Sequence, residues 1–215
     1  MAESLPSILP VFRVQSTVLM PNVHLPISMS ESDYFAICSE IVENNIVGVI
    51  QPKPMAKNRQ HQDIYKSFKI GCAGKITDIK IDDGEVHINI IGICRFEVIE
   101  DIAHDRYGIE RVKVSYDKYK LSDIEQDVEN QHAKEKLICV LDRYFKRLDI
   151  VPNWKEIEQT PLNVLVSALA MACPLHPSEK QALLETVGID ERSAMITKLI
   201  KMNSFDKYNT SKTIN

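Results

Sequence analysis

The sequence predicts an α+β protein in which a small, strongly curled β-sheet is followed by a bundle of helices. Between Gly71 and Val98, apolar residues alternate with a period close to two, which is typical of β-strands. Asp82–Gly84 interrupts this stretch and predicts the turn of a hairpin, because glycine readily adopts positive φ. After Ser122, apolar residues instead recur every three or four positions, as they do in helices.

The composition is that of a globular protein with a sizeable core, since 44% of the 215 residues are hydrophobic and 26% are charged. The formal net charge of -4 disfavours a general nucleic-acid-binding surface, so we expect no DNA partner. No apolar run approaches the roughly 20 residues that span a bilayer, so no membrane partner is expected.

Two features of the sequence predict a cytoplasmic location. The amino-terminal residues include Glu3 and have no basic residue before their apolar part, which is unlike a signal peptide. The five cysteines are scattered, odd in number and flanked by apolar residues. This pattern predicts buried free thiols in a reducing compartment rather than a disulfide framework.

The first predicted elements are extended segments that proline restricts. Ile8–Val14 predicts a strand, and two short extended pieces follow at 18–21 and 25–27. Pro21 and Pro26 place these pieces at a sheet edge or a bend, because proline offers no N–H group to a β-ladder.

A helix and a buried strand are predicted next. Ser30 suits the N-cap of a helix, and Asp33 completes a pattern like a capping box. The apolar stripe of this helix consists of Tyr34, Phe35, Ile37, Cys38, Ile41 and Val42. The compact apolar run Ile46–Ile50 predicts a buried strand. Gln51–Asp63 has no periodicity and predicts a loop, which either carries function or is a tolerated surface insertion.

The hairpin is predicted to continue into further strands. The glycines inside the strand-like sequence, which predict bulges or sharp curls, are Gly71, Gly74 and Gly92. The run after Gly92 predicts a third strand, which extends through residues 99–102. Residues 107–116 then predict a returning strand.

The remainder of the chain predicts helices. The first begins at Ser122 and reaches Leu148, with a break near Asn130 as an alternative. The later helices are predicted to start at Thr160–Pro161, Ser178 and Asp190. Each start carries a side chain that can cap free N–H groups, and Gln181 completes a capping box with Ser178. The polar residues 203–215 predict a frayed terminus.

The motifs of catalysis and of cofactor or metal binding are missing, so we expect neither an enzyme nor a cofactor. Gly74–Lys75 lacks the spacing of a phosphate loop and lies in strand-like sequence. The six histidines are dispersed, and none has metal-ligand spacing to another His, Cys or Glu. Ser178 lies near Lys180 but suits a helix cap, and Asp82 and Asp83 suit a turn.

Apolar residues in irregular segments are the candidates for binding polypeptide. Met20, Pro21, Met55 and Tyr65 lie in or beside such segments rather than in periodic faces. Apolar side chains presented from loops can hold extended polypeptide, and methionine adapts to varied partners. The alternative is that these residues close the ends of the sheet.

Three blocks of the sequence together resemble the amino-terminal, substrate-binding domain of the ATP-dependent protease Lon. The first block comprises LPVF at 9–12, MP at 20–21 and LPI at 25–27. The second is the hairpin Gly71–Val98, with its Asp-Gly turn, Gly92 and Arg95–Phe96. The third and most specific block is 173–199, CPLHPSEKQALLETVGIDERSAMITKL. The resemblance covers nearly the whole chain, about residues 5–202.

The resemblance implies a PUA-like β pseudo-barrel over residues 5–117, a helical bundle over 118–203 and a flexible tail over 204–215. The sequence has neither the phosphate loop nor the Ser-Lys pair of the family's ATPase and protease modules. It is therefore similar to the free-standing bacterial form of this domain.

The resemblance also implies a non-enzymatic module that binds exposed apolar segments of unfolded or partly folded client proteins. An adaptor role in protein quality control, with a protease or a second copy of the chain as a partner, is the finer expectation. The alternative is a small-ligand- or RNA-binding module, because PUA-like barrels often bind RNA. The acidic balance of the chain disfavours RNA.

Overall fold

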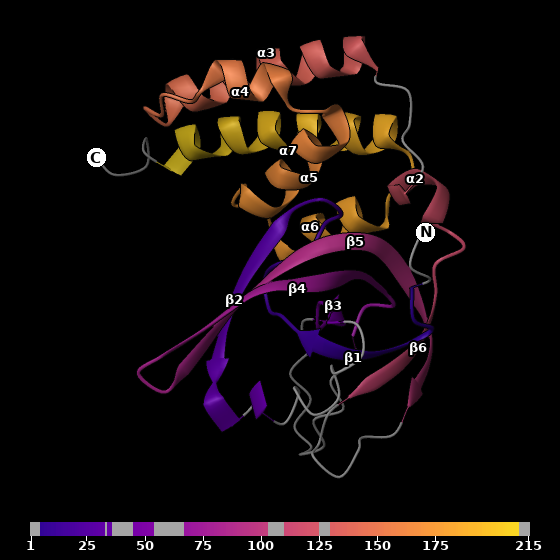
Figure 1. Ribbon diagram of the computed structural model, residues 1–215. Helices are drawn as coiled ribbons and strands as arrows, with labels where there is room; N and C mark the ends of the chain where they lie inside the picture. Colours follow the sequence, from indigo (N-terminus) through magenta and orange to yellow (C-terminus); the bar gives the residue numbers. More distant parts are fainter. Residues whose placement is uncertain are drawn as a thin grey trace. The chain divides into compact units, whose positions relative to one another are not determined.

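The computed structural model describes residues 5–32, 34–35, 45–53, 67–102, 110–124 and 130–210, and for residues 204–210 it describes the backbone alone. The chain divides into two compact units, Met1–Glu125 and Gln126–Asn215. The first unit contains a β-sheet and the second is helical, so the predicted α+β class is confirmed (Figure 1).

The first unit is a six-stranded sheet with a short helix after its last strand. The elements are β1 (Ile8–Arg13), β2 (His24–Ser30), β3 (Ile46–Ile50), β4 (Ile70–Asp82), β5 (Glu85–Ile102), β6 (Arg111–Ser115) and α2 (Lys120–Ile124). The strand order is β2-β5-β4-β3-β1-β6, and β6 also pairs with β5. Because β6 pairs with both β1 and β5, the strands β1, β3, β4, β5 and β6 close into a barrel (Figure 1).

The long strands β4 and β5 each belong to two structures. Near the start of β4, residues 70–75 pair with β5 inside the barrel. Toward the hairpin turn, residues 85–91 of β5 pair with β4 on one side and with β2 on the other. We call this second structure, formed by β2 with residues 76–82 and 85–91, the ribbon. It ends at the turn Asp83–Gly84, where both residues have positive φ.

The structure corrects the prediction of a third strand after Gly92. β5 runs unbroken from Glu85 to Ile102, and Gly92 lies opposite Gly74 at a register shift. The glycines therefore mark a bulge within one hairpin, as their position in strand-like sequence predicted. β6 returns antiparallel to β5, although residues 103–109 of the predicted turn and strand lie outside the described residues.

Two predictions on either side of β3 fall largely on residues that the structure does not describe. Ser30 is the last residue of β2, and the backbone is helical at 31–32 and 34–35, while the rest of the predicted helix lies outside the described residues. The predicted loop Gln51–Asp63 is described only as far as Lys53. β3 itself is buried at every position, as its apolar run predicted.

The barrel has a compact apolar core. Its buried members are Leu9, Ile46, Ile50, Ala73, Phe96, Val112 and Val114. A Cβ atom at Gly71 would lie 2.7 Å from Cζ of Phe96, and one at Gly48 would lie 3.1 Å from the same atom. Glycine at these positions thus leaves room for the Phe96 ring, whose edge faces Tyr116 at a centroid distance of 6.4 Å.

A buried ion pair joins β5 to α2. The guanidinium of Arg95 donates to both carboxylate oxygens of Asp123, and the Arg95 backbone N–H also donates to Asp123 at 2.9 Å. The two side chains are 0% and 1% exposed, and Arg95 lies 4.4 Å from the centre of the Tyr119 ring. These contacts place α2 in the same compact unit as the sheet, and that unit ends at Glu125.

The second unit consists of helices alone within its described residues. They are α3 (Gln131–Arg147), α4 (Trp154–Gln159), α5 (Leu162–Ala172), α6 (Pro177–Glu185) and α7 (Ile189–Thr210). α3 and α7 lie side by side, and α5 and α6 also pack against α7 (Figure 1). The most buried apolar side chains of this unit are Leu137, Leu141, Val166, Ala170, Leu183, Leu184, Ile196 and Ile200.

The first helices of this unit partly follow the predicted starts. Asn130 caps α3 by accepting a hydrogen bond from the Ala133 N–H at 3.1 Å, which confirms the alternative of a break near Asn130. The sequence did not predict α4. Thr160 ends α4 rather than capping α5, because its hydroxyl donates to the Glu156 carbonyl at 2.8 Å.

The last two helices differ from the prediction at their ends. His176, not Ser178, caps α6, and Glu179 rather than Gln181 completes the capping box. The difference arises because Pro177, which has no N–H to satisfy, takes the first helical position and shifts the cap to the preceding residue. α7 extends to Thr210, past the expected start of a frayed terminus.

Candidate functional site

The structure describes two of the four residues predicted to bind polypeptide. Met20 is 0% exposed and Pro21 is buried, whereas Met55 and Tyr65 lie outside the described residues. The assumption that Met20 and Pro21 present their side chains to solvent is therefore wrong. Their burial agrees with the alternative that they close an end of the sheet, and the role of all four residues in binding stays a prediction.

A close crossing at Gly92 explains this burial. The Asn22 N–H donates to the Gly92 carbonyl at 2.9 Å, and the Gly92 N–H donates to the Val23 carbonyl at 3.0 Å. A Cβ atom at residue 92 would lie 2.1 Å from the Met20 carbonyl oxygen. Only glycine admits a backbone this close, so the segment before β2 is pressed against β5.

One face of the ribbon is apolar. Its cross-strand rows, in the order β2, β5, β4, are Ile27–Ile88–Ile79 and Met29–Val86–Ile81. Directly opposed residues of neighbouring strands project to the same side of a sheet, so these side chains form a continuous surface. We call this surface the apolar ribbon face.

The opposite face of the ribbon is polar. Its rows are Pro26–Asn89–Asp78 and Ser28–His87–Lys80. The Ser28 hydroxyl and Nδ1 of His87 lie 2.7 Å apart and share a hydrogen bond. The ribbon is therefore amphipathic, with one side suited to water and the other to an apolar partner.

The apolar ribbon face is buried at its centre and exposed along β4. Val86 is 0% exposed and Ile88 is 2% exposed, whereas Ile79 is 43% and Ile81 is 53% exposed. The segment after β2 is held at the hairpin turn, because the Glu31 N–H donates to the Gly84 carbonyl. Phe35 lies about one helical turn after Glu31 and is 60% exposed. Adjacent exposed apolar side chains of this size commonly mark an interaction surface.

The outer edge of β2 adds backbone hydrogen-bonding groups to this surface. β2 is the last strand in the sheet order, and within the described ranges it pairs with β5 alone. An edge strand offers N–H and C=O groups to an extended chain, although Pro26 removes one donor from it. The sequence predicted a sheet edge or a bend for this segment, and the edge position agrees with the structure. The exposure of Ile79 and Ile81 was not predicted, since alternation alone does not say which rows are covered.

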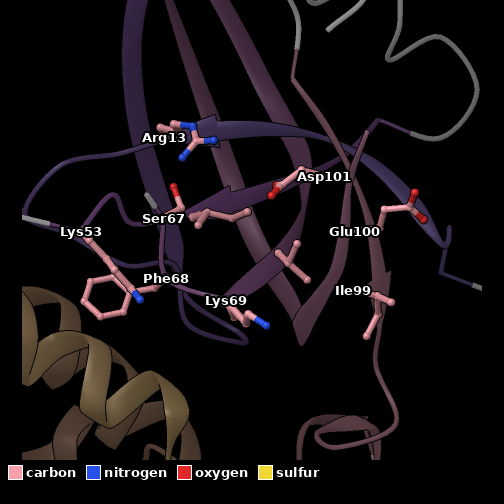
Figure 2. Close-up of a pocket in the computed structure, with 10 residues that line it drawn as sticks. Arg13, Lys53, Ser67, Phe68, Lys69, Ile99, Glu100 and Asp101 are labelled. Atoms are coloured by element: carbon pink, nitrogen blue, oxygen red, sulfur yellow. The ribbon is translucent and has the colours of Figure 1, made fainter. Parts of the chain in front are cut away.

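A second candidate is a cavity of about 370 Å³ at the barrel (Figure 2). It is lined by Arg13, Ile50, Lys53, Ser67, Phe68, Lys69, Val98, Ile99, Glu100 and Asp101. Its walls come from β1, β3, β5 and the segment before β4, which closure of the barrel brings together. The sequence predicted none of these residues as a site, because they are spread over most of the first unit.

The cavity contains both signs of charge. The Arg13 guanidinium pairs with Glu110, and Nζ of Lys53 lies 5.5 Å from the centre of the Phe68 ring. Figure 2 shows the Asp101 carboxylate directed toward the space between the labelled side chains and the Glu100 carboxylate directed away from it. The Ser67 hydroxyl is buried and has no hydrogen-bond partner among the described residues. This mixture suits a small polar ligand better than a polyanion.

The cysteines of the barrel are poor nucleophiles. Burial raises the pKa of the Cys94 thiol to about 12, and the nearby Asp123 carboxylate adds to the shift. Burial likewise raises the pKa of Cys72 well above its ordinary value. Because the thiolate is the reactive form, neither residue is activated at neutral pH. Cys139, in contrast to the predicted burial, is exposed on α3.

The neighbours Ser178 and Lys180 do not form a catalytic pair. The Ser178 hydroxyl lies 2.7 Å from Nδ1 of His176, whereas Nζ of Lys180 donates to the Met171 carbonyl at 2.9 Å. Burial lowers the pKa of Lys180, but its ammonium group holds the end of α5. Both residues thus stabilise helix ends. In the described part of the chain, no three or more His, Cys, Asp or Glu residues cluster in a way that could hold a metal ion.

The described helices do not include one that is both long and apolar enough to cross a membrane.

Comparison with known proteins connects this architecture to one family. The chain matches the family model of the ATP-dependent protease La (LON) substrate-binding domain over residues 8–202. It is 24% identical over 202 residues to the Lon protease of Dictyoglomus thermophilum and 28% identical over 207 residues to that of Cytophaga hutchinsonii. These alignments cover 91% and 92% of the chain but 24% of each relative, so the chain spans about a quarter of their length.

Solved structures agree on the fold. The N-terminal domain of the Mycobacterium avium complex Lon protease superposes with a TM-score of 0.60 at 18% identity, covering 90% of this chain and 98% of that one. A Lon N-terminal domain protein from Xanthomonas campestris gives a TM-score of 0.62 at 15% identity, covering 93% and 99%. Since the family model covers nearly the whole chain, the protein belongs to the family of Lon substrate-binding domains.

Proposed function

We propose that the chain binds exposed apolar segments of unfolded or partly folded proteins through the apolar ribbon face and performs no bond-breaking of its own. The exposure of Ile79 and Ile81 in a member of a substrate-binding family is the observation that carries this proposal. Folded proteins bury most of their large apolar side chains, so a surface of this kind favours clients that have lost their structure.

The contact is expected to be weak and tolerant of sequence. Covering a half-exposed isoleucine contributes on the order of 1 kcal/mol, so the two isoleucines together contribute roughly 2 kcal/mol. Phe35 can add to this area from the helical turn after β2. A modest apolar contribution without a specific pocket allows many clients to bind and to leave, which suits delivery to a proteolytic module.

Delivery to a protease forms the second step of the proposal. The curated relatives are Lon proteases, and this chain matches about a quarter of their length. We therefore propose that client capture by this chain serves proteolysis. A degradation assay with and without the chain, in the presence of a Lon protease, tests this step separately from binding.

The binding step is tested by fluorescence anisotropy with a labelled, permanently unfolded protein such as reduced and carboxymethylated α-lactalbumin. We expect the chain to bind this probe but not the native protein. The double substitution Ile79→Ser and Ile81→Ser should weaken binding by roughly tenfold or more, because the lost apolar contact contributes about 2 kcal/mol.

The matched control carries Ile8→Ser and Ile150→Ser, since each of these isoleucines is 47% exposed but lies outside the ribbon. The control should bind the unfolded probe as the unmodified chain does. An equal loss of affinity in both variants, or equal affinity for the folded and unfolded probes, would show that the apolar ribbon face is not the binding site.

Met55 and Tyr65 remain proposed contacts with the client. The substitutions Met55→Ser and Tyr65→Ser are tested in the same anisotropy assay. Met20 and Pro21 are proposed to act indirectly, because their contact with Gly92 fixes the chain that leads into β2. A Met55→Ser and Tyr65→Ser double variant that binds the unfolded probe normally would leave the ribbon as the sole proposed surface.

The cavity at the barrel favours a second candidate function, the binding of a small polar ligand. Its volume of about 370 Å³ lies within the usual range of ligand pockets, and the Ser67 hydroxyl inside it lacks a partner among described residues. Lysines and the Asp101 carboxylate around the same space suit a ligand that bears both charges. Lys69→Glu should abolish such binding without affecting the unfolded-protein assay.

A mobility-shift assay with RNA over a range of salt concentrations tests the RNA alternative.

A further inference from the structure

A groove of about 430 Å³ runs between α3 and α7 in the second unit. The two helices are tied at their amino-terminal ends, where the Asn130 side-chain amide donates to Oδ1 of Asp190 at 2.9 Å. They lie side by side from this point (Figure 1). The groove is therefore a feature of two firmly packed helices rather than of a loop.

Small side chains form the floor of the groove. Ala133 of α3 and Ser193, Ala194 and Thr197 of α7 line it. The Thr197 hydroxyl donates to the Ser193 carbonyl at 2.7 Å, so this polar group is satisfied within the helix. Short, satisfied side chains let a ligand approach the helix backbones without displacing long residues.

Cations form the walls of the groove. Lys136 of α3 and Lys198 and Lys201 of α7 line it and are exposed, as is His132. Among the described side chains, no carboxylate lies within ion-pair distance of these lysines. Among the described residues that line the groove, only Asp190 is acidic, and it lies at the end where Asn130 contacts it.

The length of the groove suits a short polypeptide segment. Asp190, Ala194, Lys198 and Lys201 lie along one side of α7, because residues three and four apart are neighbours on a helix. This row spans about 16 Å, which corresponds to roughly five residues of extended chain. A ligand of that size can meet several lysines at once.

We propose that the groove between α3 and α7 binds an acidic polypeptide segment, with carboxylates over Lys136, Lys198 and Lys201. Charge complementarity carries this assignment, since the walls present unpaired cations on a chain whose net charge is -4. A nucleic acid is a poorer occupant. It carries a charge at every nucleotide and would place a phosphate near Asp190, whereas a polypeptide can place an uncharged residue there.

This site is independent of the proposed capture of unfolded clients. The apolar ribbon face belongs to the first unit, and the groove belongs to the second. The two proposed sites therefore share none of the described residues.

The test uses the full chain and fluorescent peptides of about ten residues, long enough to exceed the groove. One peptide alternates Glu and Ala, and the matched peptide alternates Gln and Ala. We expect the Glu peptide to bind with an affinity that falls as the salt concentration rises from about 50 mM to about 200 mM. Reversing all three charges, with Lys136→Glu, Lys198→Glu and Lys201→Glu, should weaken binding by roughly tenfold or more.

A second triple variant controls for overall charge. Lys113→Glu, Lys146→Glu and Lys155→Glu change the net charge by the same amount at exposed positions outside the groove. This control should retain most of the binding, and circular dichroism should show both variants folded. Equal loss in the two variants, equal affinity for the Glu and Gln peptides, or tighter binding of a single-stranded RNA of similar length would each overturn the proposal.

Discussion

The barrel and the ribbon share the two long strands β4 and β5, yet they use apolar alternation in opposite ways. In the barrel halves of β4 and β5, Ala73 and Phe96 enter a closed core and are 0% exposed. In the ribbon halves, Ile79 and Ile81 keep about half of their surface in water. One hairpin therefore supplies both part of the buried core of the first unit and a pair of exposed isoleucines.

The difference shows where changes should affect stability and where they should affect binding. The barrel closes because β6 pairs with both β1 and β5, and its outer side is secured by the buried Arg95–Asp123 pair. The ribbon has no such closure among the described strands, since β2 ends the sheet order. Substitutions at buried positions of the barrel should thus lower the stability of the unit, and substitutions at the exposed positions of the ribbon should leave it folded.

The largest effect is expected for Asp123→Ala. This change leaves the Arg95 guanidinium buried without its carboxylate, which typically costs about 3–5 kcal/mol of the free energy of unfolding. Urea denaturation followed by circular dichroism measures the loss. Asp78→Ala is the matched control in the ribbon, because that carboxylate is exposed, and it should change stability by less than about 0.5 kcal/mol. Similar losses of unfolding free energy in both variants would contradict the proposed difference in stability between the barrel and the ribbon.

A smaller but clear loss is expected for Gly92→Ala. The new methyl group would lie 2.1 Å from the Met20 carbonyl oxygen, so β5 or the crossing segment must move, at a cost of about 1–3 kcal/mol or more. Gly84→Asn provides the comparison at the ribbon turn, where φ is +81° and the space is open. Asparagine tolerates this conformation, so the control should remain near the stability of the unmodified chain. A fully tolerated Gly92→Ala would contradict the close crossing.

The buried thiol of the barrel should make stability depend on pH. Because folding raises the pKa of Cys94 from 9.0 to about 12, mainly through burial, the unfolded chain releases this proton first as the pH rises. The contribution of this pKa shift to the free energy of unfolding is therefore complete below pH 9.0 and is lost as the pH rises toward about 12. Unfolding free energies measured at about pH 8 and about pH 10 should differ, and Cys94→Ala should reduce that difference. Cys139→Ala, which removes an exposed thiol, should leave it unchanged.

The smallest effect on stability is expected in the apolar ribbon face. Ile79→Thr and Ile81→Thr keep the β-branched side chains that strands favour, so each should alter the free energy of unfolding by about 0.5 kcal/mol or less. Ile50→Thr in the barrel core, which is 3% exposed, should cost about 1–3 kcal/mol because a hydroxyl is buried. Comparable losses at the two sites would mean that the ribbon face is covered and unavailable to clients.

Predictions made from the sequence succeeded where the signal was local. The Asp-Asp-Gly turn, the buried run of β3 and the start of α3 after Asn130 all follow from neighbouring residues. The N-cap of α6 lies at His176 rather than Ser178, since Pro177 takes the first helical position, and the N-cap of α5 is Pro161 rather than Thr160. Exposure depends on tertiary contacts, so the burial of Met20 and Pro21 did not follow from the sequence, and their role in binding stays a prediction.

The sequence by itself determined the strand periodicity, the turns, most of the helix starts and the likeness to Lon substrate-binding domains, because these depend on residues close together along the chain. Only the tertiary structure decided that Met20 is pressed against Gly92, that Arg95 finds Asp123 and that Ile79 stays exposed while Phe96 does not. These outcomes depend on which distant strands pair and on where the barrel closes. Identical apolar patterns therefore become core at one end of a hairpin and surface at the other.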